Sequence, residues 1–278
     1  MTKQSRNSPA PARRRVLLLD SEALEPLTRL AAPFEAQAMD WAGLTETAQL
    51  AAPSTVVVID PFARRGSPDL DARIPALLAA ARMLPVVALV PFRARYAGAA
   101  RALLDAGVAE LADAGLEQTA EAIRMRLLSV HAQPLKKRIE ASLSRFVSVD
   151  GLTLVRAAAE VAADHGTAVE LGRLFDAKER TVAGWCAREN LPPPRRLLAW
   201  VRLLLALALL EERHRSVLNA ATCAGLTDYS LRRALGELLG GRAPTRERTL
   251  RDGLAAFNAE LRELREKARQ KRRESYAA

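Results

Sequence analysis

The chain is poor in cysteine, histidine and aromatic residues, and each shortage excludes a class of protein. Its 278 residues include only two cysteines, Cys186 and Cys223, and three histidines. Two cysteines cannot form a disulfide framework or a cysteine-rich zinc site, so we expect both to be small core residues in a reducing compartment. The spacing of His131, His165 and His214 matches no metal-binding motif. The sequence therefore gives no support to a zinc protein or a disulfide-stapled secreted domain.

Long apolar runs are also missing. The longest, residues 203–210, is far shorter than the ~20 residues that a membrane helix needs. The basic N-terminal stretch is followed by only four apolar residues, 16–19, which is not the pattern of a signal peptide. We therefore expect a flexible tail over residues 1–12, no membrane partner and a cytoplasmic location.

Basic residues are in excess, mainly in the second half of the chain. The formal net charge is +10, of which residues 151–278 carry +7 and residues 1–150 carry +3. A concentrated positive charge attracts anionic partners. Nucleic acid is therefore the first expectation for the second half.

The first half alternates short apolar runs with segments of helical periodicity. Residues 15–20, 55–60 and 85–90 are apolar at nearly every position, which is typical of parallel strands covered on both faces. Weaker strands are predicted at 34–39 and 108–111, and helices near 22–31, 43–51, 69–82, 97–106 and 116–130. This alternation predicts an α/β domain over residues 13–130, with a flavodoxin-like, five-stranded parallel sheet.

Two acidic residues, Asp20 and Asp60, end two of the predicted strands. The carboxyl ends of parallel strands are where open α/β sheets carry their chemistry. The pair either holds a Mg²⁺ ion, with Asp60 as a phosphoacceptor, or simply terminates the strands. We expect no other cofactor. No catalytic constellation or glycine-rich phosphate loop is recognisable, so we do not expect an enzyme.

Residues 15–130 resemble the receiver domain of two-component response regulators. The segments that carry the resemblance are LLLD ending at Asp20, VVVID ending at Asp60, PVVAL at 85–89 and LLDAGVAEL at 103–111. The resemblance implies that Asp60 is the phosphoacceptor position. Ser21, Val90 and Ala114 stand where the family has an acid, a hydroxyl residue and a lysine. Because the hydroxyl and the ammonium contact the incoming phosphoryl group, the resemblance implies a degenerate receiver that conventional phosphorylation does not control.

The second half contains no strand-like run and is predicted to be all helical. A basic amphipathic helix over residues 135–149, within a linker at 131–150, is expected to be a solvated connector. Three prolines at 192–194 precede a leucine-rich helix at 195–210. Because that helix is apolar nearly all round, we expect it to be a buried central spine.

Two helix–turn–helix outlines flank this spine. In residues 169–191, Asp176 and Glu179 form a capping-box signature at the start of the second helix. In residues 216–239, a turn at 225–227 precedes a helix that Asp228 can cap. The outward residues suit base edges and phosphates, although a helical hairpin with a charged outer face fits the first segment almost equally well. These outward residues are Lys178, Arg180, Thr181, Gly184 and Arg188 in the first unit, and Tyr229, Ser230, Arg232 and Arg233 in the second.

Residues 151–248 resemble the DNA-binding module of AraC-type transcription factors. The resemblance is carried by Leu171-Gly172, Arg180-Thr181-Val182, Arg202-Leu203, the segment SVLNAATCAGL at 216–226, and the spacing of Asp228, Ser230, Gly241 and Pro244. It implies that the two second helices enter successive major grooves about 34 Å apart. Arg180 and Arg188 would then read guanine edges, and the other cations and hydroxyls would contact phosphates. The family's aromatic positions fall on Arg232 and Gly236, which predicts a rotated or more loosely binding second helix.

A basic amphipathic helix is predicted at the C-terminus, over residues 249–278. Its apolar residues step by four and three: Leu250, Leu254, Phe257, Leu261 and Leu264. This seam either forms a short homodimeric coiled coil or folds back on its own domain. The basic residues that follow, at 269–273, contact phosphates or are solvated.

The sequence as a whole predicts a transcriptional regulator: a receiver-like domain joined to a module that binds double-stranded DNA. The alternative from another class is a receiver-like adaptor that docks a protein partner and has lost DNA binding. The mismatches at Arg232 and Gly236 favour the adaptor, and the basic charge of the second half favours the regulator.

Overall fold

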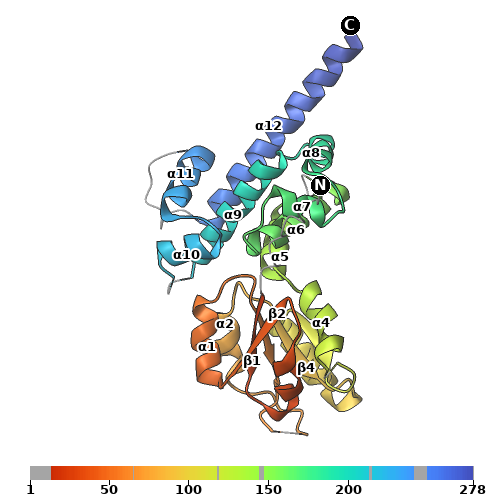
Figure 1. Ribbon diagram of the computed structural model, residues 1–278, viewed down its shortest axis with the longest axis vertical. Coiled ribbons are helices and arrows are strands. Elements are labelled where there is room, and N and C mark those ends of the chain that lie inside the picture. Colours follow the sequence, from red (N-terminus) through yellow and green to blue (C-terminus); the bar gives the residue numbers. More distant parts are fainter. Residues whose placement is uncertain are drawn as a thin grey trace, which may run out of the picture.

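The computed structural model describes residues 14–64, 66–117, 119–143, 147–212, 215–240 and 249–277. Figure 1 shows an α/β part at one end, a helical part beside it, and a long C-terminal helix that projects away from both. The predicted tail at residues 1–12 lies outside the described residues, as do Gly241 and Pro244.

The α/β part is built on one parallel sheet in the order β2-β1-β3-β4-β5. This is the flavodoxin-like strand order. The strands are β1 (Arg14–Leu19), β2 (Phe34–Met39), β3 (Val56–Ile59), β4 (Val86–Val90) and β5 (Glu110–Asp113). Every residue of β3 and β4 is buried, which explains why these strands are apolar at every position. The predicted five-stranded parallel sheet is confirmed.

Helices cover both faces of this sheet. They are η1 (Glu22–Arg29), α1 (Trp41–Leu50), α2 (Ile74–Ala80), η2 (Ala94–Tyr96), α3 (Ala97–Ala106) and α4 (Ala120–Ser129). Helix α1 packs against α2, and α4 packs against η1. The first of these segments is a 3-10 helix, whereas helical periodicity predicted an ordinary helix at 22–31. Pro26 lies inside it, and a proline in a helix interior removes a backbone donor and disfavours a regular α-helix.

The helical part is organised around α9 (Pro194–Leu210), as the apolar sequence predicted. Its neighbours are α5 (Gln133–Leu143), α6 (Val149–Ala163), α7 (Ala168–Arg173), α8 (Glu179–Arg188), α10 (Val217–Cys223), α11 (Asp228–Leu239) and α12 (Leu250–Ala277). Helices α6, α7, α8, α10, α11 and α12 all pack against α9, whose residues 203–209 are buried. In the described part of the chain after residue 130 there is no strand, and no described helix is long and apolar enough to cross a membrane.

Helix α5 is packed rather than solvated, contrary to the expectation for the linker. Leu135, Ile139 and Leu143 are buried in the same core as α6, because their spacing of four residues places them on one face. Ion pairs on the flank of this face join α5 to α6, including Lys136 with Glu160 at 2.6 Å. The predicted connector is therefore part of the helical core.

The apolar seam of α12 packs within the chain. Leu250, Phe257 and Leu261 are buried, and the Phe257 ring stacks on Trp200 of α9 with centroids 5.2 Å apart. Gly253 allows the close approach, since a Cβ there would lie 2.6 Å from Leu207. Of the two alternatives for the seam, the structure shows the intramolecular one. Leu254 and Leu264 are half-buried on the same face, so the homodimeric coiled coil gains no support from this packing.

Two polar clusters tie the α/β part to the helical part. On β1, Arg14 donates to Asp164 at the end of α6 at 2.7 Å, and buried His131 lies 3.1 Å from the same carboxylate. Before α10, buried Arg215 pairs with Glu212 and donates to the carbonyl of Ala51 at the end of α1, at 3.0 Å. The α/β part is thus connected to the segment that precedes each of the helix pairs α7–α8 and α10–α11.

Candidate nucleic-acid interface

The α7–α8 pair owes its compact turn to one glycine and one cap. Thr167 and Glu170 form a capping box at the start of α7, and the hydrogen bonds from Thr167 lower the pKa of Glu170. Gly172 is required because a Cβ there would lie 2.5 Å from the carbonyl oxygen of Ala177. The turn therefore lies directly against α7 and fixes the direction in which α8 leaves it.

The start of α8 differs from the prediction. The N-cap is Lys178, which makes no side-chain capping bond, and Asp176 lies two residues further out with φ of 49° in the turn. Asp176 and Glu179 therefore do not form the predicted capping box, since only the N-cap side chain reaches the first free N–H groups. The first backbone donors of α8 have no side-chain acceptor from the N-cap.

One face of α8 is buried and the opposite face is exposed. Val182 and Cys186 lie in the core, and Trp185 meets Phe175 of the turn edge-on, with centroids 5.7 Å apart. Burial raises the pKa of Cys186 to about 11, which makes it an unreactive thiol, as expected for a core cysteine. The outward face carries the predicted residues, all of them exposed: Lys178, Arg180, Thr181, Gly184 and Arg188.

The cations of α8 are not neutralised by nearby acids. No ion pair among the described residues includes Lys178, Arg180 or Arg188, whereas both acids at the ends of the helix have partners. Glu179 pairs with Arg195 at 2.9 Å, and Glu189 accepts a hydrogen bond from a serine hydroxyl at the start of α6. The outward face of α8 therefore offers free positive charge to an anionic ligand.

The α10–α11 pair has a similar layout with a different start. The turn is made at Gly225, whose φ is +68°, with the His165 ring packed against it. Thr227 caps α11 by accepting from the Ser230 N–H at 3.0 Å. Asp228, the predicted cap, is instead the first residue of the helix, because the threonine before it occupies the capping position.

The arginines of α11 are paired within their own helix. Arg232 lies 2.9 Å from Asp228, and Arg233 lies 2.6 Å from Glu237, one turn away in each case. The hydrogen bond from Arg233 to Glu237 raises the pKa of Arg233. Tyr229 is 73% exposed and completes the outward face beside the partly buried Ser230. This face is less positive than the face of α8.

The predicted DNA-binding residues thus lie on two separate surfaces. Lys178, Arg180, Thr181 and Arg188 belong to α8 and its N-cap, and the other four belong to α11. In Figure 1, α11 and α8 lie to the left and right of the central helices α9 and α12. The shared packing on α9 fixes the separation of the two surfaces.

The strand-ending acids of the α/β part line two different cavities. Asp60 lines a cavity of about 360 Å³ together with Phe62, Tyr96 and Ala114. Burial raises the pKa of Asp60, and a hydrogen bond from the Phe62 N–H opposes this effect. Asp20 does not line this cavity, so the hypothesis of a metal held by the two carboxylates gains no structural support.

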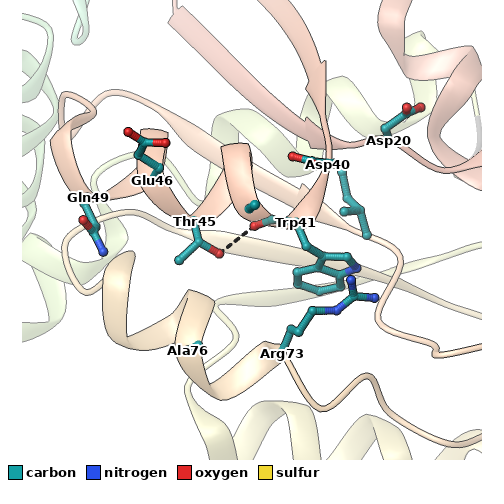
Figure 2. A pocket seen from close by; sticks show the side chains of 10 residues that line it. Asp20, Asp40, Trp41, Thr45, Glu46, Gln49, Arg73 and Ala76 are labelled. Carbon is teal, nitrogen blue, oxygen red and sulfur yellow. Dashed lines mark hydrogen bonds between the residues drawn. The ribbon is translucent and has the colours of Figure 1, made fainter.

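Asp20 lies at a larger cavity of about 710 Å³, which the sequence did not predict. Figure 2 shows its wall: Asp40 precedes α1, and the Arg73 guanidinium lies against the Trp41 ring, 4.9 Å from its centroid. The only feature of the sequence that could have indicated this cavity is the pair Asp40-Trp41, directly after β2. Within the described residues, no three His, Cys, Asp or Glu side chains are grouped so as to hold a metal.

Comparison of the chain with protein-family models, with curated proteins and with solved structures gave no match.

Proposed function

We propose that this protein is a sequence-specific, DNA-binding transcriptional regulator. In this proposal, α7–α8 and α10–α11 act as two helix–turn–helix units, and α8 is the main reading helix. The observation that carries the proposal is the outward face of α8, where Lys178, Arg180 and Arg188 are exposed and have no ionic partner among the described residues. Arginine on an exposed helix face is the side chain best suited to guanine edges in the major groove.

The shape of the helical part supports the same proposal. A reading helix must be held rigidly, and α8 buries Val182 and Cys186 against the core around α9. The second unit packs on the same helix, α9, so that α8 and α11 can bind one duplex with a fixed spacing. The net charge of +7 in residues 151–278 favours the approach of a polyanion.

The α/β part acts in this proposal as a receiver-like domain that conventional phosphorylation does not control. The Asp60 cavity is lined by Ala114 at the position of the receiver lysine, and Val90 is buried at the position of the receiver hydroxyl. Neither side chain can stabilise a transferred phosphoryl group. Incubation with a small phosphodonor and Mg²⁺ should therefore add no phosphoryl mass to the intact protein.

Selection of bound DNA from a random pool tests the proposal. The full chain should enrich a defined motif, and its affinity for that motif should fall steeply as salt rises, because phosphate contacts release counterions. Arg180→Ala should weaken binding to the motif more than binding to scrambled DNA. A matched control is Arg101→Ala, which removes an exposed arginine from the α/β part. No enriched motif, together with no salt-dependent DNA binding, would overturn the proposal.

The second candidate is a protein-interaction adaptor that has lost DNA binding. The pairing of Arg232 and Arg233 within α11 favours it, because those arginines give up part of their charge to their own helix. The selection experiment decides between the two, since an adaptor of this kind enriches no DNA motif.

A further inference from the structure

Most glycines of the helical part are explained by the fold. A Cβ at Gly151, Gly166, Gly172 or Gly253 would lie 2.5–2.8 Å from neighbouring atoms. Close packing therefore requires a residue without a side chain at these positions. Gly225 has φ of +68°, which other residues rarely adopt.

Gly184 has neither of these reasons. It lies in the middle of α8, its backbone is not left-handed, and, apart from its chain neighbours and the backbone of its own helix, no atom lies within 4 Å of where its Cβ would be. A glycine inside a helix is less favourable than alanine, because it loses more conformational freedom on folding. The fold therefore tolerates Gly184 at a cost and gains no packing from it.

The position of Gly184 points to a ligand. Arg180 lies one turn before it and Arg188 one turn after it, so the three residues follow one line on the exposed face. The backbone of α8 is bare at this point, between two arginines with no ionic partner among the described residues.

We propose that Gly184 is the point at which α8 comes closest to DNA, and that it sets how deeply the helix enters the major groove. The inference rests on the proposed function. Without a side chain at 184, the helix backbone can approach the base edges until Arg180 and Arg188 reach them on either side. Gly184 is thus a positioning residue that acts through the two arginines.

Two other glycines provide comparisons. Gly236 of α11 is equally bare and follows Arg232 by four residues, but Arg232 is paired and Glu237 adds negative charge beside it. Gly98 is exposed and has open space, but it lies in the first turn of α3 in the α/β part. Of these three glycines, Gly184 is the one that combines an exposed helix turn without a side chain with neighbouring arginines that have no ionic partner among the described residues.

The test is to replace Gly184 with alanine and with leucine, and to measure both thermal unfolding and binding to the selected DNA motif. Because the space is open and the helix gains propensity, Gly184→Ala should raise the unfolding midpoint by about 2 °C. Gly184→Leu should unfold no earlier than the wild type, yet bind the motif about tenfold more weakly, because the side chain holds the arginines away from the bases. The matched control, Gly98→Leu, should leave DNA binding unchanged.

Each other outcome has a definite meaning. If Gly184→Leu binds the motif as tightly as the wild type, the inference is overturned and the proposed function stands. If Gly184→Leu unfolds earlier than the wild type, the space at 184 is not open and the inference is overturned as well. If the wild type itself enriches no motif, the proposed function fails, and the inference fails with it.

Discussion

The two helix pairs share a layout but differ in how their charges are used. Each places a short helix, a turn and a second helix against α9, and each buries apolar residues of the second helix, such as Val182 and Leu231. On α8 the cations have no ionic partners among the described residues, whereas on α11 Arg232 and Arg233 are each paired one turn away. The apolar pattern sets the layout, and the neighbouring acids decide whether the exposed charge is free for a partner.

The pairs also differ in how they start and how they are held. The first residues of α11 are capped by Thr227, but α8 has no side-chain cap. The first pair follows Asp164, whose ion pair with Arg14 of β1 is partly buried, and the second follows Arg215, which is fully buried and reaches the end of α1. We call the Arg215 and Asp164 clusters the anchors of the second and first pairs. We expect the stability of the second pair to depend more on its anchor, and the stability of the first pair to depend more on the ligand proposed for it.

The largest expected effect is on stability, at the anchor of the second pair. Arg215→Met should lower the free energy of unfolding by about 3–5 kcal/mol, because Glu212 is left as a buried charge without its partner. Denaturant unfolding followed by circular dichroism measures this loss. The double variant with Glu212→Leu should recover part of it, and a single-variant loss below about 1 kcal/mol would show that the anchor matters little.

The next effect is on DNA binding by the first pair. Arg180→Ala should weaken binding to the selected motif by about 1–3 kcal/mol and relax the sequence preference, because the proposed guanine contact would be lost. Fluorescence anisotropy with cognate and scrambled duplexes measures both changes. Equal losses of affinity on the two duplexes would indicate that Arg180 contacts phosphate. The expected difference between α8 and α11 in reading the sequence would then be weaker.

The anchor of the first pair should be sensitive to acid. Burial raises the pKa of Asp164, but the hydrogen bonds and charges of His131 and Arg14 outweigh it and hold the pKa below its ordinary value. Ionised Asp164 therefore stabilises the fold at pH above about 4, and this contribution is lost as pH falls through the lowered pKa. At neutral pH, Asp164→Asn should cost about 1–2 kcal/mol. The free energies of unfolding of the variant and the wild type, measured from pH 7 downward, should converge. A difference between them that stays constant with pH would contradict this account.

The two helix starts should respond differently to loss of their N-cap side chains. Thr227→Ala should lower the free energy of unfolding by about 1 kcal/mol, because it removes the acceptor for the Ser230 N–H. Lys178→Ala should change stability by less than about 0.5 kcal/mol, because its side chain makes no capping bond. Thermal unfolding of the two variants side by side provides the measurement, and equal losses would remove this difference between the pairs.

The smallest effect is expected on α11. Arg233→Ala should weaken binding to every DNA sequence alike, by about twofold, and reduce the salt slope by no more than about 1. The physical reason is that Arg233 already shares its charge with Glu237. Salt titrations on cognate and scrambled duplexes measure both values. A sequence-dependent loss as large as that of Arg180→Ala would make the two helices equivalent readers.

Much of the fold could be predicted from the sequence because the main signals are local. The runs at 56–59 and 86–90 are apolar at every position, which occurs in strands covered on both faces, and these strands were found where expected. The leucine-rich segment at 195–210 is likewise a buried spine. Exposure of Arg180 and Arg188 followed from helical periodicity, which places them away from Val182 and Trp185, and the structure buries Val182 and half-buries Trp185.

The parts that could not be predicted depend on contacts between distant residues or on a choice between neighbours. Nothing local indicates that Arg215 bonds to Ala51, which is 164 positions away. The N-cap of α11 went to Thr227 rather than Asp228, a difference of one residue between two good capping types. The seam of α12 is compatible with a second copy of the chain or with its own domain, and the side chains of α9 that contact it, which are distant in the sequence, are needed to see the intramolecular packing.

The burial of both native thiols has a practical consequence for spectroscopy. Cys186 and Cys223 are the only cysteines of the chain, both lie in the core, and burial raises the pKa of each. A cysteine introduced at the surface will react far faster with a maleimide dye, since thiolate is the reacting species. Dye pairs on the outward faces of α8 and α11 can therefore report the span between them, without first removing a native residue.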